Sequence, residues 1–178
     1  MQRVLIIATD GFEQSELMEP KRLLEAAGAE VTVGSLRPGE IRGWDQENWG
    51  ESVAVDLLVG NVSAEDYDAL LLPGGQINPD VLRTQRAVIE LIREFDAAGK
   101  PIAAICHAPW LLAEADLIEG RTVTSWPSIR TDLANAGAAV VDEAVVVDGN
   151  LITSRKPDDI PAFTEALMAA LNMEAAEA

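Results

Sequence analysis

The hydrophobic and polar positions of this chain repeat one unit, an amphipathic helix that ends at glycine and leads into a short apolar run. Apolar residues at helical spacing predict a helix over residues 16–27, Gly28 ends it, and a strand begins at residue 30. The same order recurs twice, at residues 88–98, 99 and 102–105, and at residues 129–136, 137 and 139–141. Glycine just past a helix accommodates the left-handed backbone of that position. Helices and strands are therefore expected to alternate along most of the chain.

The expected strands are apolar at every position rather than at alternate positions. Residues 70–72 and 102–105 contain only leucine, isoleucine and alanine. Such strands have both faces covered, as in parallel sheets with helices on both sides. The pattern predicts an α/β sandwich around a mostly parallel sheet. No linker, repeat array or low-complexity stretch divides the sequence, so residues 1–178 are interpreted as one domain.

Two segments depart from this alternation. Residues 39–56 lack helical periodicity and contain three glycines and two tryptophans, which indicates a short hairpin or an extended loop. Residues 145–153 predict a β-hairpin, with the type I′ turn that Asp148-Gly149 favours. After Pro157 a last helix is expected to run to about residue 171, and residues 174–178 are expected to fray.

Charge and composition narrow the classes of partner. The chain has 13 basic and 30 acidic residues, a formal net charge of −17. This argues against nucleic acid or an anionic membrane as partner, because both bind basic faces. No apolar run approaches the roughly 20 residues that cross a bilayer, and the strand pattern begins without a signal peptide. The single cysteine cannot form an internal disulfide, so a cytoplasmic protein is expected.

The only cysteine and the only histidine are neighbours at the end of an expected strand. Cys106 follows the apolar run 101–105, His107 comes next, and residues 108–112 favour a helix. A sharp strand-to-helix turn exposes a nucleophile beside helix N-terminal amides, which stabilise a thiolate and lower its pKa. The alternative is an inert cysteine, because free cysteine is among the most buried residue types.

Two other segments are expected to reach the same place, because ligands of open α/β sheets bind at the carboxyl ends of the parallel strands. They are residues 9–16, after the first strand, and Pro73-Gly74-Gly75, after the strand 70–72. Gly74 and Gly75 let the backbone approach a ligand closely, and with the His107 amide they are suited to bind a developing negative oxygen. An ordinary turn is the alternative interpretation.

Glu13, Glu16 and Glu19 are spaced three residues apart at the start of a helix. Acidic side chains there complement the helix dipole and need no further role, which is the first interpretation of Glu13 and Glu19. Glu13 is also included among the expected pocket residues. Glu16 is placed to reach the thiol, where a protonated carboxyl donates a hydrogen bond to sulfur.

A histidine that acts as a base needs an orienting acceptor, commonly a carboxylate. Adjacent residues of a strand project to opposite faces, but a tight turn breaks this alternation, so both contact with Cys106 and a pocket-lining role stay open for His107. Asp80, just past the glycine pair, is a candidate acceptor or a helix cap. Trp126, near the end of an expected strand at residues 121–124, is placed at the pocket rim.

Three separated motifs resemble those of the ThiJ/PfpI superfamily. They are Asp10-Gly11-Phe12-Glu13 with Glu16-Leu17, then Leu71-Leu72-Pro73-Gly74-Gly75, then Ala103-Ala104-Ile105-Cys106-His107-Ala108-Pro109. The likeness is greatest to the PfpI branch of intracellular cysteine proteases and general-stress proteins. It implies a flavodoxin-like, three-layer α/β sandwich of the class I glutamine amidotransferase type. Such a fold has a mostly parallel sheet with helices on both faces, here with a small β-hairpin.

The resemblance also implies roles for individual residues. Cys106 corresponds to the nucleophile, Glu16 to the glutamate that hydrogen-bonds it, and Gly75 with the His107 amide to the oxyanion site. In PfpI-type proteases a glutamate from a neighbouring subunit orients the histidine, and Asp80 aligns with that glutamate. Homo-oligomers, either dimers or trimer-based hexamers, are implied as well.

Three functions are compatible with these residues. The main hypothesis is a stress enzyme without cofactor or metal, in which Cys106 adds to a small carbonyl such as methylglyoxal or to its protein adducts. The second is a peptidase or amidase in which Asp80 of a neighbouring subunit completes a triad with Cys106 and His107. The third is a redox sensor or chaperone in which Cys106 is oxidised to a sulfinate held by Glu16.

Overall fold

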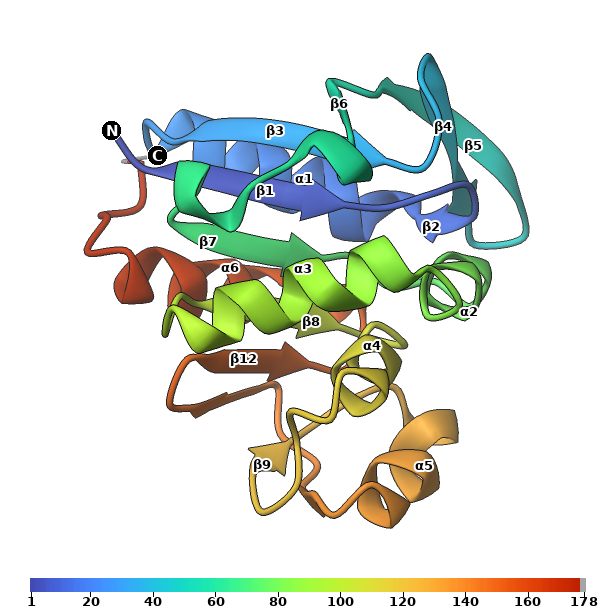
Figure 1. Cartoon of the computed structure of the whole chain (residues 1–178), viewed down its shortest axis with the longest axis vertical. Helices are drawn as coiled ribbons and strands as arrows, with labels where there is room; N and C mark the ends of the chain where they lie inside the picture. Colours follow the sequence, from blue (N-terminus) through green and yellow to red (C-terminus); the bar gives the residue numbers. More distant parts are fainter. Residues whose placement is uncertain (177–178) are drawn as a thin grey trace.

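A seven-stranded sheet forms the centre of the computed structural model, which describes residues 1–176 (Figure 1). Its strand order is β11-β12-β8-β7-β1-β3-β6, and every neighbouring pair is parallel except β11 with β12. The strands are β1 (Arg3–Ile7), β3 (Glu30–Ser35), β6 (Leu57–Leu58), β7 (Ala69–Leu72), β8 (Ile102–Ile105), β11 (Val145–Asp148) and β12 (Leu151–Ser154). The expected mostly parallel, flavodoxin-like sandwich is confirmed.

Helices cover both faces of the sheet (Figure 1). One face carries α1 (Gln14–Ala26) and α6 (Ile160–Ala170); the other carries α3 (Arg86–Ala97) and α4 (Pro109–Glu114), with α2 (Ile77–Leu82) and α5 (Arg130–Asn135) beside them. Leu70 and Leu72 of β7 pack into the α3 side, whereas Leu71 packs into the α1 side. All three are fully buried, and burial of a leucine contributes about 1.5–3 kcal/mol. These strands are apolar at every position because helices cover both faces of the sheet.

The three predicted helix ends are also confirmed. The glycines that follow α1, α3 and α5 have positive φ angles: Gly28 at 96°, Gly99 at 68° and Gly137 at 96°. In this conformation the amide of Gly28 donates to the carbonyl of Glu25 at 3.0 Å, which satisfies a helix C-terminal acceptor. Each short loop then leads directly into the next strand.

The segment 39–56 forms a hairpin of β4 (Glu40–Asp45) and β5 (Asn48–Ala54) that stands apart from the main sheet (Figure 1). The short strand β2 (Phe12–Glu13) pairs with β4 and attaches the hairpin to the end of β1. The rings of Trp44 and Trp49 meet edge to face across the hairpin, with centroids 5.4 Å apart. The hairpin alternative of the sequence prediction is therefore correct.

The second hairpin forms, but its turn differs from the predicted one. Asp148 pairs with Leu151, so the two loop residues are Gly149 and Asn150 rather than Asp148-Gly149. Asp148 is held in the strand because its carboxylate accepts the amide of Thr122 at 2.7 Å. Gly149, with φ 58°, supplies the left-handed backbone at the first loop position.

The C-terminal part adds small elements around the sheet. The strands expected at residues 121–124 and 139–141 are short, β9 (Thr122–Val123) and β10 (Ala139–Val140), and pair with each other rather than with the main sheet. One-turn 3₁₀ helices span Val59–Asn61, Ala64–Asp66, Pro127–Ile129 and Pro157–Asp159, the last leading into α6. The final helix therefore agrees with the prediction; of the tail expected to fray, residues 177 and 178 lie outside the described residues.

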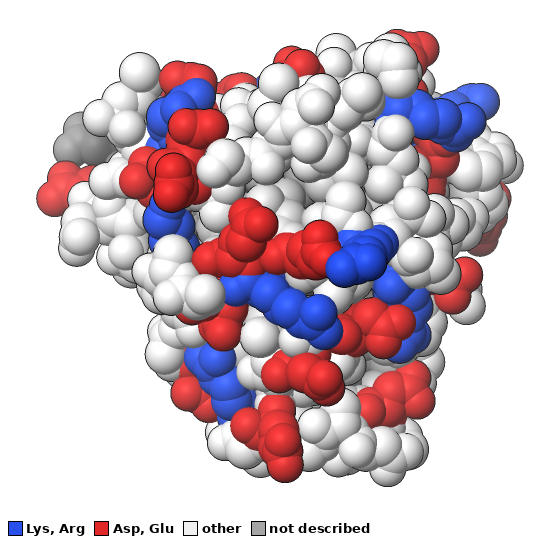
Figure 2. Space-filling view, in the orientation of Figure 1, with Lys and Arg blue, Asp and Glu red and all other residues white. Residues whose placement is uncertain are grey.

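The surface over α3 mixes charges of both signs (Figure 2). Arg86 Nε, for example, lies 2.6 Å from Glu90 Oε1, one helical turn away. Exposed pairs of this kind add little to stability, because water screens them. Among the helices of the described residues, none has the length and apolar character needed to span a membrane.

Candidate active site

Cys106 occupies a strained turn between β8 and α4. Its φ angle is 66°, a left-handed conformation that non-glycine residues adopt at a cost of roughly 1–3 kcal/mol. Both backbone polar groups hold it there: its amide donates to Ser154 O at 3.0 Å, and its carbonyl accepts the Trp126 amide at 2.8 Å. The turn directs the side chain toward the carboxyl edge of the sheet, where it lines a pocket although only 6% of the residue is exposed.

Glu16 lies next to the thiol on α1 and is fully buried. Its Oε1 atom accepts the Gly74 amide at 3.1 Å, while Oε2 has no partner within the described part of the chain. Burial, with the charge of Glu13 second, raises the pKa of Glu16 to about 8, against the opposing effects of the Gly74 amide and of the nearby Cys106 thiol. The carboxyl is therefore mostly protonated at neutral pH and can donate a hydrogen bond.

The pKa of the Cys106 thiol is raised, whereas the sequence predicted that it would be lowered. Burial and the negative charge of Glu16 raise the pKa of the thiol, and the amides of Gly75 and His107 only partly oppose them. The helix cannot supply more, because Pro109 has no amide hydrogen and the amides of Ala108 and Trp110 are bonded to backbone carbonyls. The expectation of a lowered thiol pKa is therefore wrong for the single chain: the His107 amide does lower it, but burial and the charge of Glu16 outweigh that effect.

The glycine pair allows three segments to converge. A Cβ atom on Gly74 would lie 2.5 Å from Glu16 Oε1 and 2.6 Å from Cys106 Cβ. At Gly75, where φ is 83°, a Cβ atom would lie 2.6 Å from the backbone of Gly11 and of Glu13. Only glycine fits this approach, which leaves the Gly75 amide directed at the sulfur.

Asn78, which was not predicted as a site residue, joins these loops. It is fully buried; its Oδ1 accepts the Thr9 amide at 2.8 Å, and its Nδ2 donates to Pro73 O at 3.0 Å. The side chain thus joins the loop after β1 to the loop after β7. Its place in Asn78-Pro79 beside the glycine pair was the available signal.

His107 contacts Cys106 despite being its neighbour in sequence. Nδ1 lies 3.2 Å from Cys106 Sγ, and Nε2 lies 3.3 Å from Ser128 Oγ. Trp126 stacks on the ring with centroids 5.9 Å apart, and Trp110 meets it edge-on at 5.3 Å. Burial lowers the pKa of His107, so the ring is neutral at neutral pH and can accept a proton.

Asp80 does not join this group within one chain. It is exposed on α2, is absent from the pocket lining, and makes no hydrogen bond to the His107 ring in the part of the chain that is described. A role for Asp80 toward the histidine of another subunit stays a prediction. Within the chain, the partner of the second ring nitrogen, Nε2, is the Ser128 hydroxyl rather than a carboxylate.

The pocket above the thiol encloses about 300 Å³. It is lined by Glu13, Glu16, Trp44, Gln46, Gly75, Gln76, Cys106, His107, Trp126 and Pro157. Glu13 is half-buried, and burial together with the charge of Asp45 raises its pKa. The hairpin forms one wall of the pocket, which was not predicted; there Trp44 of β4 pairs with Glu13 of β2. The two tryptophans in an irregular segment were its only signal.

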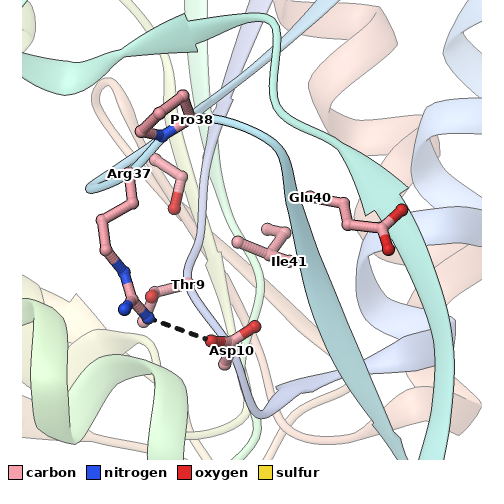
Figure 3. A pocket seen from close by; sticks show the side chains of 7 residues that line it. Thr9, Asp10, Arg37, Pro38, Glu40 and Ile41 are labelled. Carbon is pink, nitrogen blue, oxygen red and sulfur yellow. Dashed lines mark hydrogen bonds and ion pairs between the residues drawn. The ribbon is translucent and has the colours of Figure 1, made fainter.

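A second, smaller cavity lies near the carboxyl ends of β1 and β3 (Figure 3). It encloses about 150 Å³ between Thr9, Asp10, Ser35, Arg37, Pro38, Glu40 and Ile41. Arg37 points toward Asp10, with Nη2 and Oδ2 3.5 Å apart (Figure 3). Its lining has no thiol or imidazole, so nucleophilic chemistry belongs to the pocket at Cys106. Over residues 1–176 no group of three or more His, Cys, Asp or Glu side chains is arranged to hold a metal ion.

The sequence profile of the DJ-1/PfpI family matches residues 2–170. The chain belongs to this family. A Pyrococcus abyssi member named as a deglycase is 42% identical over 161 residues, covering 90% of this chain and 94% of that protein. YraA of Bacillus subtilis, whose name assigns it provisionally to the cysteine proteases, is 42% identical over 163 residues, covering 91% and 94%. The crystal structure of Drosophila melanogaster DJ-1beta superposes with a TM-score of 0.86 at 30% identity, covering 99% of this chain and 91% of that one.

Proposed function

We propose that this DJ-1/PfpI protein is a cysteine-dependent stress-response enzyme that acts on reactive carbonyls, of the glyoxalase or protein deglycase type, and needs no cofactor. The observation that supports this most is the contact of three groups in one pocket: a thiol, a carboxyl that is protonated at neutral pH, and a neutral imidazole. The name of the Pyrococcus relative agrees with this assignment.

The arrangement suits addition of the thiol to an aldehyde. As the S–C bond forms, the thiol proton passes to His107 Nδ1, and the carbonyl oxygen takes the proton of Glu16, which gives a hemithioacetal. The imidazolium and the Glu16 carboxylate then exchange the proton and return to neutrality. The Gly75 and His107 amides, which face the sulfur, lie where negative charge develops on the substrate oxygen.

With methylglyoxal the same groups can complete an internal redox reaction. Moving a proton from the sulfur-bearing carbon to its neighbour oxidises the first to a thioester and reduces the second to an alcohol. Glu16, in the fraction of molecules in which it is ionised, would move this proton as the base. Water then cleaves the thioester and releases lactate, so the net reaction consumes only methylglyoxal and water.

The test compares methylglyoxal turnover of wild type, Cys106→Ser, Glu16→Gln and Glu19→Gln at matched protein concentration. Cys106→Ser should be inactive and Glu16→Gln slower by at least tenfold, because general acid catalysis contributes about 10²–10⁴-fold. Glu19→Gln is the matched control, since Glu19 is partly exposed and paired with Arg22 on the same helix. Full turnover by Cys106→Ser excludes the mechanism.

A peptidase or amidase is the second candidate, favoured by the name of YraA. In this function Cys106, His107 and Asp80 of a neighbouring subunit act together. This function requires a homo-oligomer, which we propose for this chain in the cytoplasm. Size exclusion combined with light scattering measures the oligomeric state. An obligate monomer with full peptidase activity excludes the shared triad.

A further inference from the structure

We infer that Ser128 is a positioning residue, which holds His107 with its proton on Nε2 and so leaves Nδ1 free to take the proton of Cys106 within a single chain. The inference rests on the proposed function only for the use of that proton transfer. It assigns to a neutral hydroxyl of the same subunit the position for which the sequence predicted a carboxylate.

A backbone hydrogen bond to Cys106 fixes the position of the segment that bears Ser128. The 3₁₀ helix Pro127–Ile129 begins after Trp126, whose amide donates to Cys106 O at 2.8 Å. Ile129 is buried in the core, and its amide donates to Trp126 O at 3.2 Å, which closes the turn. Ser128 therefore lies on a segment that is bonded to the turn at Cys106 and packed into the core, although Ser128 itself is exposed.

The ring of His107 has little freedom to take another orientation. Trp126 stacks on one face, and Trp110 touches it edge-on. Trp110 is itself fixed, because its Nε1 donates to Asp132 Oδ2 at 2.9 Å and Arg83 lies over its ring at 5.3 Å. The two ring nitrogens consequently keep separate partners, Sγ at Nδ1 and Oγ at Nε2.

The partners decide the tautomer. A protonated thiol donates a hydrogen bond, whereas its sulfur accepts only weakly. Nδ1 is therefore best left unprotonated, so that it accepts the hydrogen bond from the thiol. Nε2 then carries the hydrogen and needs an acceptor, which the Ser128 hydroxyl provides. After Nδ1 takes the thiol proton, Nε2–H keeps the same acceptor, so the hydroxyl serves both states of the ring.

No charged group takes over from Ser128 in orienting the His107 ring within the described residues. Glu13 and Glu16 line the same pocket, and Arg83 lies over Trp110. Within the described residues the hydrogen-bond partners of the ring are Cys106 and Ser128 alone. Because a serine is neutral, it orients the ring without stabilising the imidazolium as a carboxylate does, and transfer to His107 stays transient.

The experiment uses the fact that the chain has one histidine and one cysteine. ¹⁵N-labelled full-length protein is measured by NMR at neutral pH, where long-range ¹H–¹⁵N couplings identify the protonated ring nitrogen. We expect the Nε2–H tautomer with an exchange-protected imidazole proton in the wild type, loss of that protection in Ser128→Ala, and its recovery in Ser128→Thr. A wild-type ring protonated on Nδ1, or protection unchanged in Ser128→Ala, overturns the inference.

A second measurement follows the rate of Cys106 alkylation by iodoacetamide. Loss of one hydrogen bond should slow the reaction in Ser128→Ala by roughly fivefold, with rescue in Ser128→Thr. Ser125→Ala is the matched control, because Ser125 donates to Trp126 O in the same loop without touching the ring. An equal slowing in Ser125→Ala identifies a merely structural effect and overturns the inference. Neither readout requires turnover, so both stand apart from a failure of the proposed carbonyl reaction.

Discussion

The Sγ atom of Cys106 lies 3.2 Å from Nδ1 of His107, the residue that follows it in the chain. Consecutive side chains of a regular strand point to opposite faces, so this contact depends on the positive φ of Cys106. The strain of one residue thus brings a proton donor and a proton acceptor together without a long-range contact. Because the strain belongs to Cys106 alone, substitutions at this residue can measure it.

Replacing Cys106 separates the strain from the chemistry. We expect Cys106→Gly to be more stable than Cys106→Ala by about 1 kcal/mol, because glycine adopts a φ of 66° without the steric penalty. Both variants lack the thiol and should be equally inactive. Urea denaturation monitored by tryptophan fluorescence measures the difference, and an alanine variant that is the more stable would show that the turn is unstrained.

The raised pKa of Glu16 predicts how stability depends on pH. The folded carboxyl keeps its proton up to about pH 8, whereas the unfolded one loses it near the usual 4.5. The native state therefore binds more protons between these values, and its free energy of unfolding falls as pH rises toward 8. Glu16→Gln should remove this fall, as measured by urea denaturation at pH 6.5, 7.25 and 8.

The pH range and the control isolate Glu16. Burial lowers the pKa of His107 below the ordinary 6.5, so this residue acts in the opposite sense, and its effect fades as pH rises above 6.5. Glu19→Gln should leave the slope unchanged, because Arg22 lowers the pKa of Glu19 rather than raising it. A wild-type slope that persists in Glu16→Gln would refute the assignment.

Gly74 should tolerate no side chain. Its Cβ atom would strike both Glu16 and Cys106, so Gly74→Ala must displace one of them, and we expect a loss of roughly 1–3 kcal/mol of stability. Methylglyoxal turnover and the alkylation rate should change with it. Gly60→Ala is the control, since nothing lies within 4 Å of its Cβ position, and thermal unfolding of the two variants decides the matter.

The reactivity of Cys106 toward iodoacetamide should rise with pH without levelling off below pH 8, because burial and the charge of Glu16 raise the pKa of the thiol. In Glu16→Gln the reactivity should exceed that of the wild type above about pH 8, where the wild-type carboxyl is ionised and its charge opposes the thiolate. Mass spectrometry follows the reaction at the single cysteine. A plateau near pH 6 in the wild type would mean that the amides of Gly75 and His107 outweigh burial.

Mild peroxide tests the use of the same sulfur in sensing. If Cys106 forms a sulfinate, the intact mass should increase by about 32 Da, the mass of two oxygens, and the modification should map to Cys106. Glu16 is placed to donate a hydrogen bond to the oxidised sulfur, so Glu16→Gln should reduce the yield. An unchanged mass under excess oxidant would argue against redox sensing.

The regular part of the fold was predictable because its signals are local. Neighbouring residues alone determine helix periodicity, the glycine after each helix and the wholly apolar strands. The convergence of the three motif segments was predictable because the carboxyl ends of parallel strands meet at one edge of the sheet. The chemistry of Cys106, His107 and Glu16 could also be singled out, since a cysteine and a histidine that each occur once stand at a strand end.

Features set by tertiary contacts could not be predicted. The contact of Ser128 with His107 depends on where the segment after β9 is anchored, and Trp44 reaches the pocket only because β4 pairs with β2. The turn of the second hairpin shifted by one residue because Asp148 is held by Thr122. The direction of the Cys106 pKa depended on burial and on amides already used inside the turn.

The carbonyl of Cys106 also accepts a hydrogen bond from the amide of Trp126. The backbone of the nucleophile therefore helps to position a residue that lines its pocket. A covalent adduct that rotates this peptide would pull on the segment with the stacking indole. We therefore expect an adduct on the sulfur to change the position of the Trp126 indole, which lines the pocket.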